Sequence, residues 1–257
     1  MQENCAGVIQ WEAENALEAG YSHMIVWCAE GQYAVCNQDL CISVLPGQCL
    51  MIRKSRFVVE PVGLTGHERG MILLLDETRM ELPGTFECFL HGGSEYALFA
   101  NHSLDAVFES MIQDSLGEEL FSLKITELLL RCEHLNPIEP HTYRREDLRL
   151  AMNAYQYAME QMQAHITIQE MAERAGKSTS LLKQSFHRVY GSSVYQFIRK
   201  EKMSHAARML AESNMKVIEI AQKTGYLNSS KFSKVFTEAY GMNPTAYRKT
   251  HQKGTAE

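Results

Sequence analysis

Short apolar runs separated by turn residues dominate the first part of the chain. The runs occupy residues 23–28, 33–36, 41–45, 48–52, 57–59 and 71–75. The turn residues between them are Glu30-Gly31, Asn37-Gln38-Asp39, Pro46-Gly47 and Gly63. Such closely spaced punctuation is typical of antiparallel β structure. The pattern therefore predicts a small sandwich or barrel between about Tyr21 and Leu75.

After about Ser103 the apolar period lengthens to about 3.6 residues, which indicates helix as far as Leu135. An apolar stripe with 4-3-4-3 spacing follows one side of this helix: Phe121, Ile125, Leu128, Cys132 and Leu135. The stripe could cover the β-domain or form a seam with a second copy of the helix. Both can hold together, because Leu123, Leu129 and Leu130 provide a second apolar surface. The stripe is the candidate dimerisation surface.

A repeat near the C-terminus carries the most information. The first copy contains Ala172, Gly176, Leu182, Phe186, Gly191 and Phe197. The second copy contains Ala221, Gly225, Phe232, Phe236, Gly241 and Tyr247. The offset is 49 residues up to the turn glycine and 50 after it, so the second turn holds one inserted residue. A repeated small residue, turn glycine and second amphipathic run predict two helix-turn-helix modules in tandem.

Each module has the residues that a helix-turn-helix requires. The alanine allows close approach of the two helices, and the turn glycine supplies a positive φ. Polar caps, Ser178-Thr179 and Asn228-Ser229, precede the second helices. The predicted buried side is Leu181, Leu182, Phe186 and Val189 in the first module, and Phe232, Val235, Phe236 and Tyr240 in the second.

The remaining positions of the second helices form two polar faces. The first face contains Ser180, Lys183, Gln184, His187 and Arg188. The second contains Ser229, Ser230, Lys231, Lys234 and Thr237. Gln, Lys and Ser can hydrogen-bond to base edges in the major groove. An outer helix face is polar in most proteins, but two such faces on a duplicated scaffold favour DNA reading.

The segments around the modules complete the C-terminal half. Residues 136–143 carry two prolines and no periodicity, which predicts a linker over 136–145, and a helix begins near Arg145. Residues 194–212 form a long helical pattern between the modules. Such a helix would hold the two readers at a fixed separation, so each protomer should cover two adjacent major-groove segments, about 34 Å apart.

The net charge of −6 is unevenly divided. Residues 164–257 hold 15 Lys and Arg against 7 Asp and Glu, a balance of +8, whereas residues 1–163 have a balance of −14. A basic half beside an acidic half indicates that one part of the chain binds phosphates and the other does not.

The seven cysteines, at 5, 28, 36, 41, 49, 88 and 132, all lie in the N-terminal half. An odd count, the absence of a signal peptide and the absence of about 18 consecutive apolar residues favour a reduced, cytoplasmic chain without a membrane span. Cys36 and Cys41 lack a second pair at zinc-finger spacing, which favours small core residues over a metal site.

Residues 218–248 resemble the signature of the AraC/XylS family of bacterial transcription regulators. The match rests on Ile220-Ala221, Gly225-Tyr226, Phe232-Ser233, Phe236, Gly241, Pro244 and Arg248, and the resemblance extends over about 150–249. It implies an α+β fold: a cupin-like antiparallel effector domain at 1–102, a helical dimerisation segment at 103–135, and an all-α double helix-turn-helix domain at 146–250. It also implies a homodimer, more often an activator than a repressor, with double-stranded DNA and RNA polymerase as partners.

Two departures from the family pattern bear on its implications. Lys202 stands where the connecting helix often has Arg, and neither reading face has a large aromatic residue, which leaves base preference open. Residues 182–199 also resemble the subgroup that controls siderophore uptake, of the pyochelin type. This finer resemblance implies a siderophore as the small-molecule effector. Trp27, on the first firm strand, is the candidate for stacking on an aromatic effector, although an interior Trp is more often packing.

Two alternatives to an effector-responsive regulator differ in what the β-domain does. The β-domain of a ligand-independent regulator would serve only dimerisation or protein contact. A cupin enzyme would need a metal or a catalytic group, yet His23, His67, His91 and His102 are dispersed. Cys88 and His91 lie three residues apart but have no third orienting residue. No catalytic residue, metal ligand or cofactor is therefore predicted.

Overall fold

A computed structural model of the chain describes residues 7–9, 22–53, 57–62, 68–75, 95–113, 116–164 and 166–252. The chain divides into two compact units, Met1–Arg145 and Glu146–Glu257. Across these described ranges, no helix is long and apolar enough to cross a membrane.

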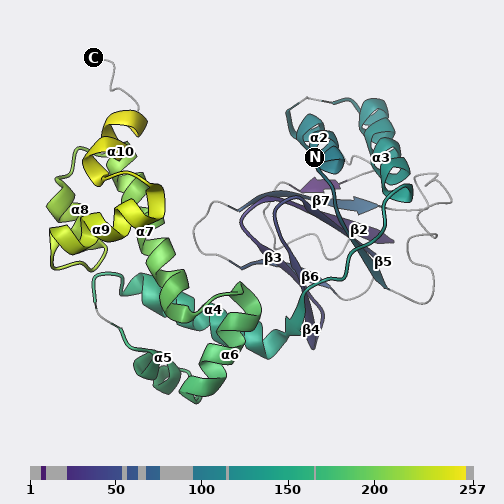
Figure 1. Cartoon of the computed structure of the whole chain (residues 1–257). Coiled ribbons are helices and arrows are strands. Elements are labelled where there is room, and N and C mark those ends of the chain that lie inside the picture. The colour runs from purple at the N-terminus through teal and green to yellow at the C-terminus, as the bar shows by residue number, and fades with distance from the viewer. Residues whose placement is uncertain are drawn as a thin grey trace. The chain divides into compact units, whose positions relative to one another are not determined.

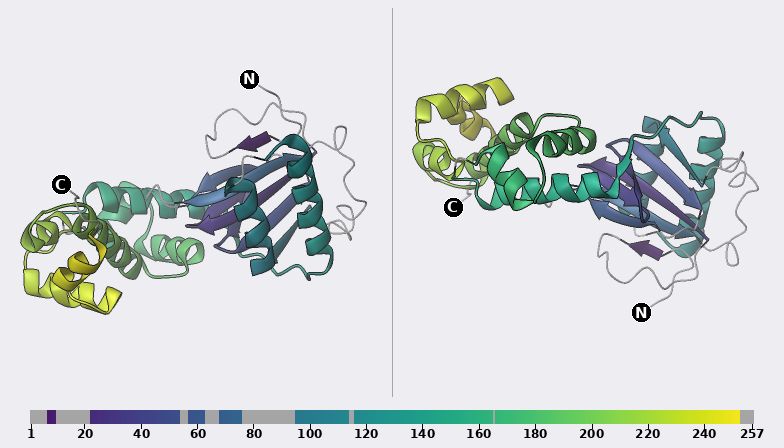
Figure 2. Two further views of the ribbon diagram at one scale, coloured as in Figure 1. Left: turned by 90° about the horizontal axis from the view of Figure 1, so that it is seen from above. Right: turned by 90° about the horizontal axis from the view of Figure 1, so that it is seen from below.

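The N-terminal unit contains two antiparallel sheets (Figures 1 and 2). The first sheet has the order β1-β7-β2-β5-β8, formed by Gly7–Ile9, Arg69–Leu75, His23–Glu30, Gln48–Arg53 and Tyr96–Ala100. The second has the order β6-β3-β4-β9, formed by Val58–Pro61, Tyr33–Cys36, Leu40–Val44 and Thr142–Arg144. Two helices, α2 (His102–Gln113) and α3 (Glu118–Glu133), lie over one face of the first sheet (Figure 2).

Strand β2 is buried on both faces, and its alternating side chains enter two different cores. Met24, Val26 and Cys28 join a cluster that also contains Val35 and Ile42 of the second sheet. Ile25 and Trp27, which point the opposite way, join a cluster that includes residues of α2 and α3. This double burial explains why residues 23–28 read as an almost continuous apolar run.

The structure places Trp27 in the core beneath α2. The side chain is 1% exposed, its indole stacks on Phe108 with ring centroids 4.8 Å apart, and Nε1 donates to Asp105 Oδ1 at 2.8 Å. An effector stacked on Trp27 would have to displace this contact. Of the histidines and cysteines named from the sequence, Cys5, His67, Cys88 and His91 lie outside the described residues.

The stripe predicted as a dimer seam is buried within one chain, which corrects that assignment. Ile125, Leu128 and Cys132 are each at most 1% exposed, and Phe121 and Leu135 pack partly buried against the same core. Leu129 is also fully buried. The stripe therefore covers the β-sheet, the other of the two interpretations that the spacing allows. Leu120, Leu123 and Leu130 stay exposed, at 56%, 64% and 46%.

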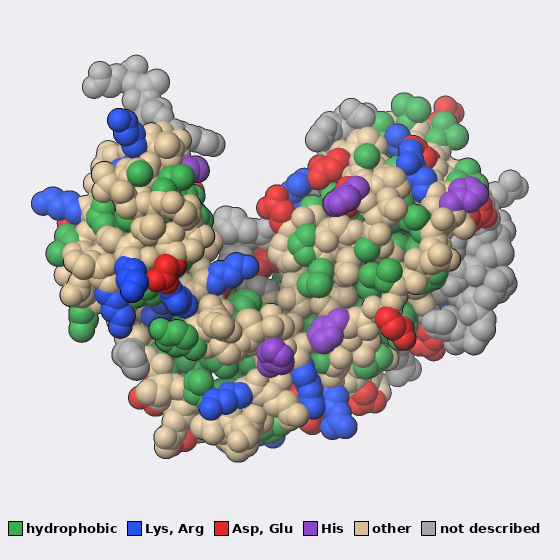
Figure 3. All heavy atoms as spheres, in the orientation of Figure 1, with side chains coloured by type: hydrophobic (Ala, Val, Ile, Leu, Met, Phe, Trp, Pro, Cys, Tyr) green, Lys and Arg blue, Asp and Glu red, His purple; other side chains and the backbone are tan. Residues whose placement is uncertain are grey.

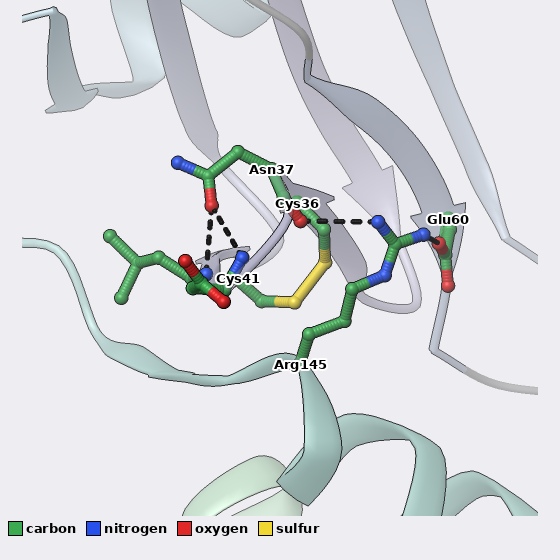
Figure 4. The surroundings of a disulfide bond; sticks show 7 residues. Cys36, Asn37, Cys41, Glu60 and Arg145 are labelled. Carbon is green, nitrogen blue, oxygen red and sulfur yellow. Dashed lines mark hydrogen bonds and ion pairs between the residues drawn. A yellow bond between two sulfur atoms is a disulfide. The ribbon is translucent and has the colours of Figure 1, made fainter.

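The segment predicted as a linker is partly a strand. Thr142–Arg144 forms β9, which pairs with β4 so that Tyr143 lies opposite Cys41, and Ile138 bridges to Leu98. Arg145 donates to the carbonyl of Asn37 at 3.1 Å and forms an ion pair with Glu60 at 2.6 Å (Figure 4). Without β9, strand β4 would be the edge of the second sheet, so an aperiodic segment can be held there by backbone pairing.

Cys36 and Cys41 form a disulfide, so the expectation of a reduced chain is wrong for this pair. The two residues are direct cross-strand partners at the end of the β3–β4 hairpin. The side chain of Asn37 closes the turn by accepting from the backbone of Asp39 and Leu40 at 3.0 and 2.8 Å (Figure 4). The half-cystines are fully buried, as the expectation of core residues requires.

The C-terminal unit is helical. Its helices are α4 (Arg145–Glu160), α5 (Ile168–Arg174), α6 (Thr179–Tyr190), α7 (Val194–Glu212), α8 (Val217–Lys223), α9 (Ser229–Tyr240) and α10 (Pro244–His251). The predicted connecting helix, residues 194–212, coincides with α7. Helices α5 and α6 contain the first predicted module, and α8 and α9 contain the second.

The same aromatic triangle stabilises both modules. In the first, Phe186 lies 4.5 Å from Tyr190 and 5.5 Å from Phe197, measured between ring centroids. In the second, Phe236 lies 4.8 Å from Tyr240 and 5.3 Å from Tyr247. The three positions are each offset by 50 residues. The repeat in the sequence is thus a repeat of packing.

We expect the cysteines to differ in their reaction with iodoacetamide. Burial raises the pKa of the Cys28 and Cys132 thiols to about 12 and that of Cys49 well above its ordinary value. These thiols stay protonated at neutral pH and should resist alkylation in the native protein. In denaturant without reductant, Cys28, Cys49 and Cys132 should be labelled. Peptide mass spectrometry would contradict the disulfide if Cys36 and Cys41 were labelled before dithiothreitol is added.

Candidate nucleic-acid interface

Matching caps fix the ends of the corresponding helices in the two modules. Glu170 and Glu219, 49 residues apart, each accept a hydrogen bond from the backbone NH three residues earlier at 2.7 Å. After the turn the offset is 50: Ser178 Oγ accepts from Leu181 N at 3.2 Å, and Asn228 Oδ1 accepts from Ser230 N at 2.8 Å. The inserted residue therefore lies in the second turn, as the sequence predicts.

Helices α6 and α9 present most of the predicted DNA-contacting residues to solvent. On α6, Ser180, Lys183, Gln184 and His187 are exposed, and on α9, Ser230, Lys231, Lys234 and Thr237 are exposed. Ser229 is half-buried. Both faces thus offer hydroxyl groups and cations along one side of a helix, which suits major-groove edges and phosphates. Figure 3 shows Lys and Arg side chains prominent on the visible face of the C-terminal unit.

Arg188 belongs to an internal cluster as well as to the predicted face. Its guanidinium forms an ion pair with Asp147 at 3.2 Å, and the hydroxyl of Ser185 donates to the same carboxylate. Asp147 is 5% exposed and lies on α4. Arg188 therefore balances the buried charge of Asp147, and the Ser185 hydroxyl adds a hydrogen bond to it. Together they tie the start of α4 to the second half of α6.

The buried sides of the two helices follow the prediction with one exception. Leu182, Phe186, Val189, Phe232 and Phe236 are buried, while Val235 and Tyr240 pack partly buried against the second core. Leu181 is 37% exposed and does not join the core. At the start of α6 the neighbouring Leu182 occupies the buried position instead.

Residues 171–250 match the family described as "Helix-turn-helix domain". The HTH-type transcriptional activator RhaR of Yersinia pestis is 28% identical over 148 residues, covering 55% of this chain and 51% of RhaR. The HTH-type transcriptional activator Btr of Bacillus subtilis is 36% identical over 91 residues, covering 35% of this chain and 17% of Btr. The chain spans about half the length of the RhaR relatives that it matches.

A solved structure is also similar to part of this chain. The C-terminal domain of AraT, a response regulator from Geobacillus stearothermophilus, aligns with a TM-score of 0.41 and 27% identity, over 42% of this chain and 90% of that domain. The match to the family and the relatives decide the nature of the C-terminal unit. It contains a helix-turn-helix domain. The resemblance to the AraC/XylS signature is supported.

The turn of the second module packs against the first half of the helix-turn-helix domain. The ammonium of Lys202, on α7, donates to the carbonyl of Met162 at 2.7 Å, and its partial burial lowers the pKa of this amine. A Cβ at Gly225 would lie 2.5 Å from that carbonyl oxygen and 2.9 Å from Lys202 Nζ. Gly225 is thus required both for its φ of +81° and for this close approach.

Arg248 joins the last helix to the end of α7. Its guanidinium donates to the carbonyls of Leu210, at 3.4 Å, and Met215. The carbonyls at the end of a helix lack partners within that helix. Arg248 therefore caps α7, a role that its position in the signature alone does not reveal.

Sequence reasoning did not single out the exposed apolar residues of the helix-turn-helix domain. Leu227 is fully exposed and Tyr195 is 68% exposed. For Leu227 a signal was present, because the second turn is one residue longer than the first. No periodicity applies in so short a turn, so the exposure of the extra residue follows only from the structure.

Replacement of the two turn glycines by alanine should have unequal effects. Gly176→Ala introduces strain at a φ of +62° but meets no atom within 4 Å, whereas Gly225→Ala adds a clash with the backbone of Met162. Left-handed backbone alone costs a residue such as Ala about 1–2 kcal/mol. We expect Gly225→Ala to lower the urea midpoint of the 222 nm circular dichroism signal more than Gly176→Ala. Equal shifts would argue against the contact with Met162.

Proposed function

We propose that the protein is a sequence-specific transcription regulator of the AraC/XylS type, most simply an effector-responsive activator. Each protomer would insert α6 and α9 into two adjacent major-groove segments of promoter DNA. The observation that carries this proposal is the pair of equally capped helices with exposed polar faces on a repeated scaffold. RNA polymerase would be the further partner of an activator.

The distribution of charge supports the same function. The +8 balance of residues 164–257 suits a polyanion, and the −14 balance of residues 1–163 would keep the other half off the duplex. Lys183 and Lys234 lie on the exposed faces of α6 and α9, one in each module. They are therefore the cations whose removal tests the proposed faces most directly.

Lys183→Ala and Lys234→Ala should each weaken binding of the full chain to its promoter, measured by fluorescence anisotropy. A phosphate contact predicts a similar loss on all sequences and a salt dependence whose slope falls by about one. A base contact instead predicts relaxed specificity at one position, by about 1–3 kcal/mol.

Lys249→Ala is the matched control, because Lys249 is an exposed lysine on α10, outside both reading helices. Affinities of the Lys183 and Lys234 variants equal to that of the unaltered protein would contradict the assigned faces. The outcome does not depend on knowing the effector.

We further propose a homodimer that uses the exposed leucine face of α3, defined by Leu120, Leu123 and Leu130. Glu127 lies on the same side of the helix, following a 3-4-3 spacing that is typical of helix-to-helix seams. Its carboxylate accepts hydrogen bonds from Lys124 and Arg131, at 2.9 and 2.7 Å, which lower its pKa. The charge of Glu127 is thus balanced by two cations of the same helix, so it does not oppose apolar contact with a second copy of α3.

Leu123→Glu should shift the protein towards monomer, because a carboxylate would be desolvated at the centre of the proposed seam. Sedimentation velocity over a range of micromolar concentrations measures the shift. Ser122→Glu adds the same charge to an exposed neighbouring position of α3 and should leave the association unchanged. A monomeric unaltered protein, or equal association of both variants, would rule out this seam.

The two-sheet N-terminal unit is proposed as a cupin-like effector domain, with a pyochelin-type siderophore as the first effector to test. A second candidate is a ligand-independent regulator, and the burial of apolar side chains between the sheets favours it: Val35, Ile42, Val44 and Leu50 are fully buried there. Anisotropy titrations with and without the siderophore separate the two. A shift in promoter affinity supports the effector domain, and unchanged affinity supports the ligand-independent regulator.

A further inference from the structure

A groove of about 550 Å³ lies between the two modules of the helix-turn-helix domain. Its walls come from the end of α4 and the segment leading into α5, the first turns of α7, the turn between α8 and α9, and the first turn of α9. Small-molecule sites in proteins have volumes of about 300–1,000 Å³. The groove is therefore large enough for a small organic ligand and is built within one unit of the chain.

The lining of the groove combines apolar side chains with cations. Ile166, Ile168 and Ile198 provide aliphatic surface, and Tyr195 and Tyr226 provide aromatic rings. The cations are Arg199, Lys202 and Lys231, and none of the described residues that line the groove is an Asp or Glu. Charge complementarity thus favours an anion, and the aliphatic and aromatic walls favour one with an apolar body rather than a bare phosphate.

The three cations are held in different ways. The ammonium of Lys202 is fixed by the carbonyl of Met162 at 2.7 Å and is partly buried. Arg199 is oriented by an ion pair with Glu238. Lys231 is exposed in the first turn of α9, where the side chain of Asn228 caps the helix. Desolvation strengthens the attraction of Lys202 for an anion, while Lys231 can move to meet one.

The inserted residue of the second turn forms part of this groove. Leu227 lines it and is nevertheless fully exposed, at a point where the first module has no corresponding residue. A leucine side chain that contacts nothing gains no hydrophobic stabilisation, whereas contact with an apolar ligand would remove it from water. The extra residue of the second module, Leu227, thus lies where an apolar ligand would contact it.

We propose that this groove binds a small amphipathic organic anion, with its apolar body between Tyr195, Ile198 and Leu227 and its acidic group facing Lys202 and Lys231. Such a ligand would contact the first turn of α9 and therefore the start of the second DNA-reading helix. The site lies outside the N-terminal unit, in which the family resemblance places the effector. Lys231 also belongs to the exposed face of α9 that is proposed to contact DNA, so the test of this site uses no DNA.

The test is a fluorescence titration of the full chain with 8-anilinonaphthalene-1-sulfonate, an aromatic anion of suitable size. Leu227→Glu places a carboxylate on the wall, and Ala164→Trp fills the groove from an exposed position that lines it. Each variant should weaken a saturable binding component roughly tenfold, because the added carboxylate repels the sulfonate and the added indole occupies its space. The uncharged analogue N-phenyl-1-naphthylamine should bind the unaltered protein more weakly by a similar factor.

Ile218→Glu is the matched control, because Ile218 is 52% exposed on α8 and does not line the groove. Its titration should equal that of the unaltered protein, and circular dichroism should show the same helix content in all variants. The proposal is overturned if the unaltered protein shows no saturable component, or if Leu227→Glu and Ala164→Trp bind the dye as Ile218→Glu does. It is equally overturned if the uncharged analogue binds as tightly as the sulfonate.

Discussion

The C-terminal unit depends on one helix that belongs to two cores. The first turns of α7 supply Phe197 to the aromatic triangle of the first module, and its second half supplies Met203, Ala206 and Leu210 to the core of the second. A helix packed in this way cannot rotate relative to either module without opening a core. The positions of α6 and α9 relative to each other are therefore fixed by side-chain packing rather than by a loop. The hydrogen bond from Lys202 to Met162 adds a second constraint.

Local signals in the sequence were sufficient to predict much of this unit. The repeat located both turns, and the structure confirms the positive φ of Gly176 and Gly225 and the caps at Ser178 and Asn228. These features depend on residues within one helical turn of each other, so their chemistry can be read directly from the chain. The bounds of α7 were predictable for the same reason.

Features that depend on distant partners were not predictable in this way. The α3 helix carries two apolar surfaces, and only the position of the β-sheet decides that Ile125 and Leu129 are buried while Leu123 is exposed. Strand β9 has no periodicity of its own, and it forms because its backbone pairs with β4. The ion pair of Arg188 joins residues 41 positions apart. In each case the distant partner, rather than the local sequence pattern, determines whether a residue is buried or paired.

The difference between the modules has a physical origin in the length of one turn. Both modules keep a polar N-cap on the second helix and the aromatic triangle, so the scaffold around α6 and α9 tolerates an extra residue in the turn without a change of packing. The turn absorbs it because Tyr226 partly buries its ring beside Phe232, which leaves Leu227 to project outward. A duplicated scaffold can thus keep one fold while its two copies present different surfaces, since only the turns and outer faces lie outside the shared core.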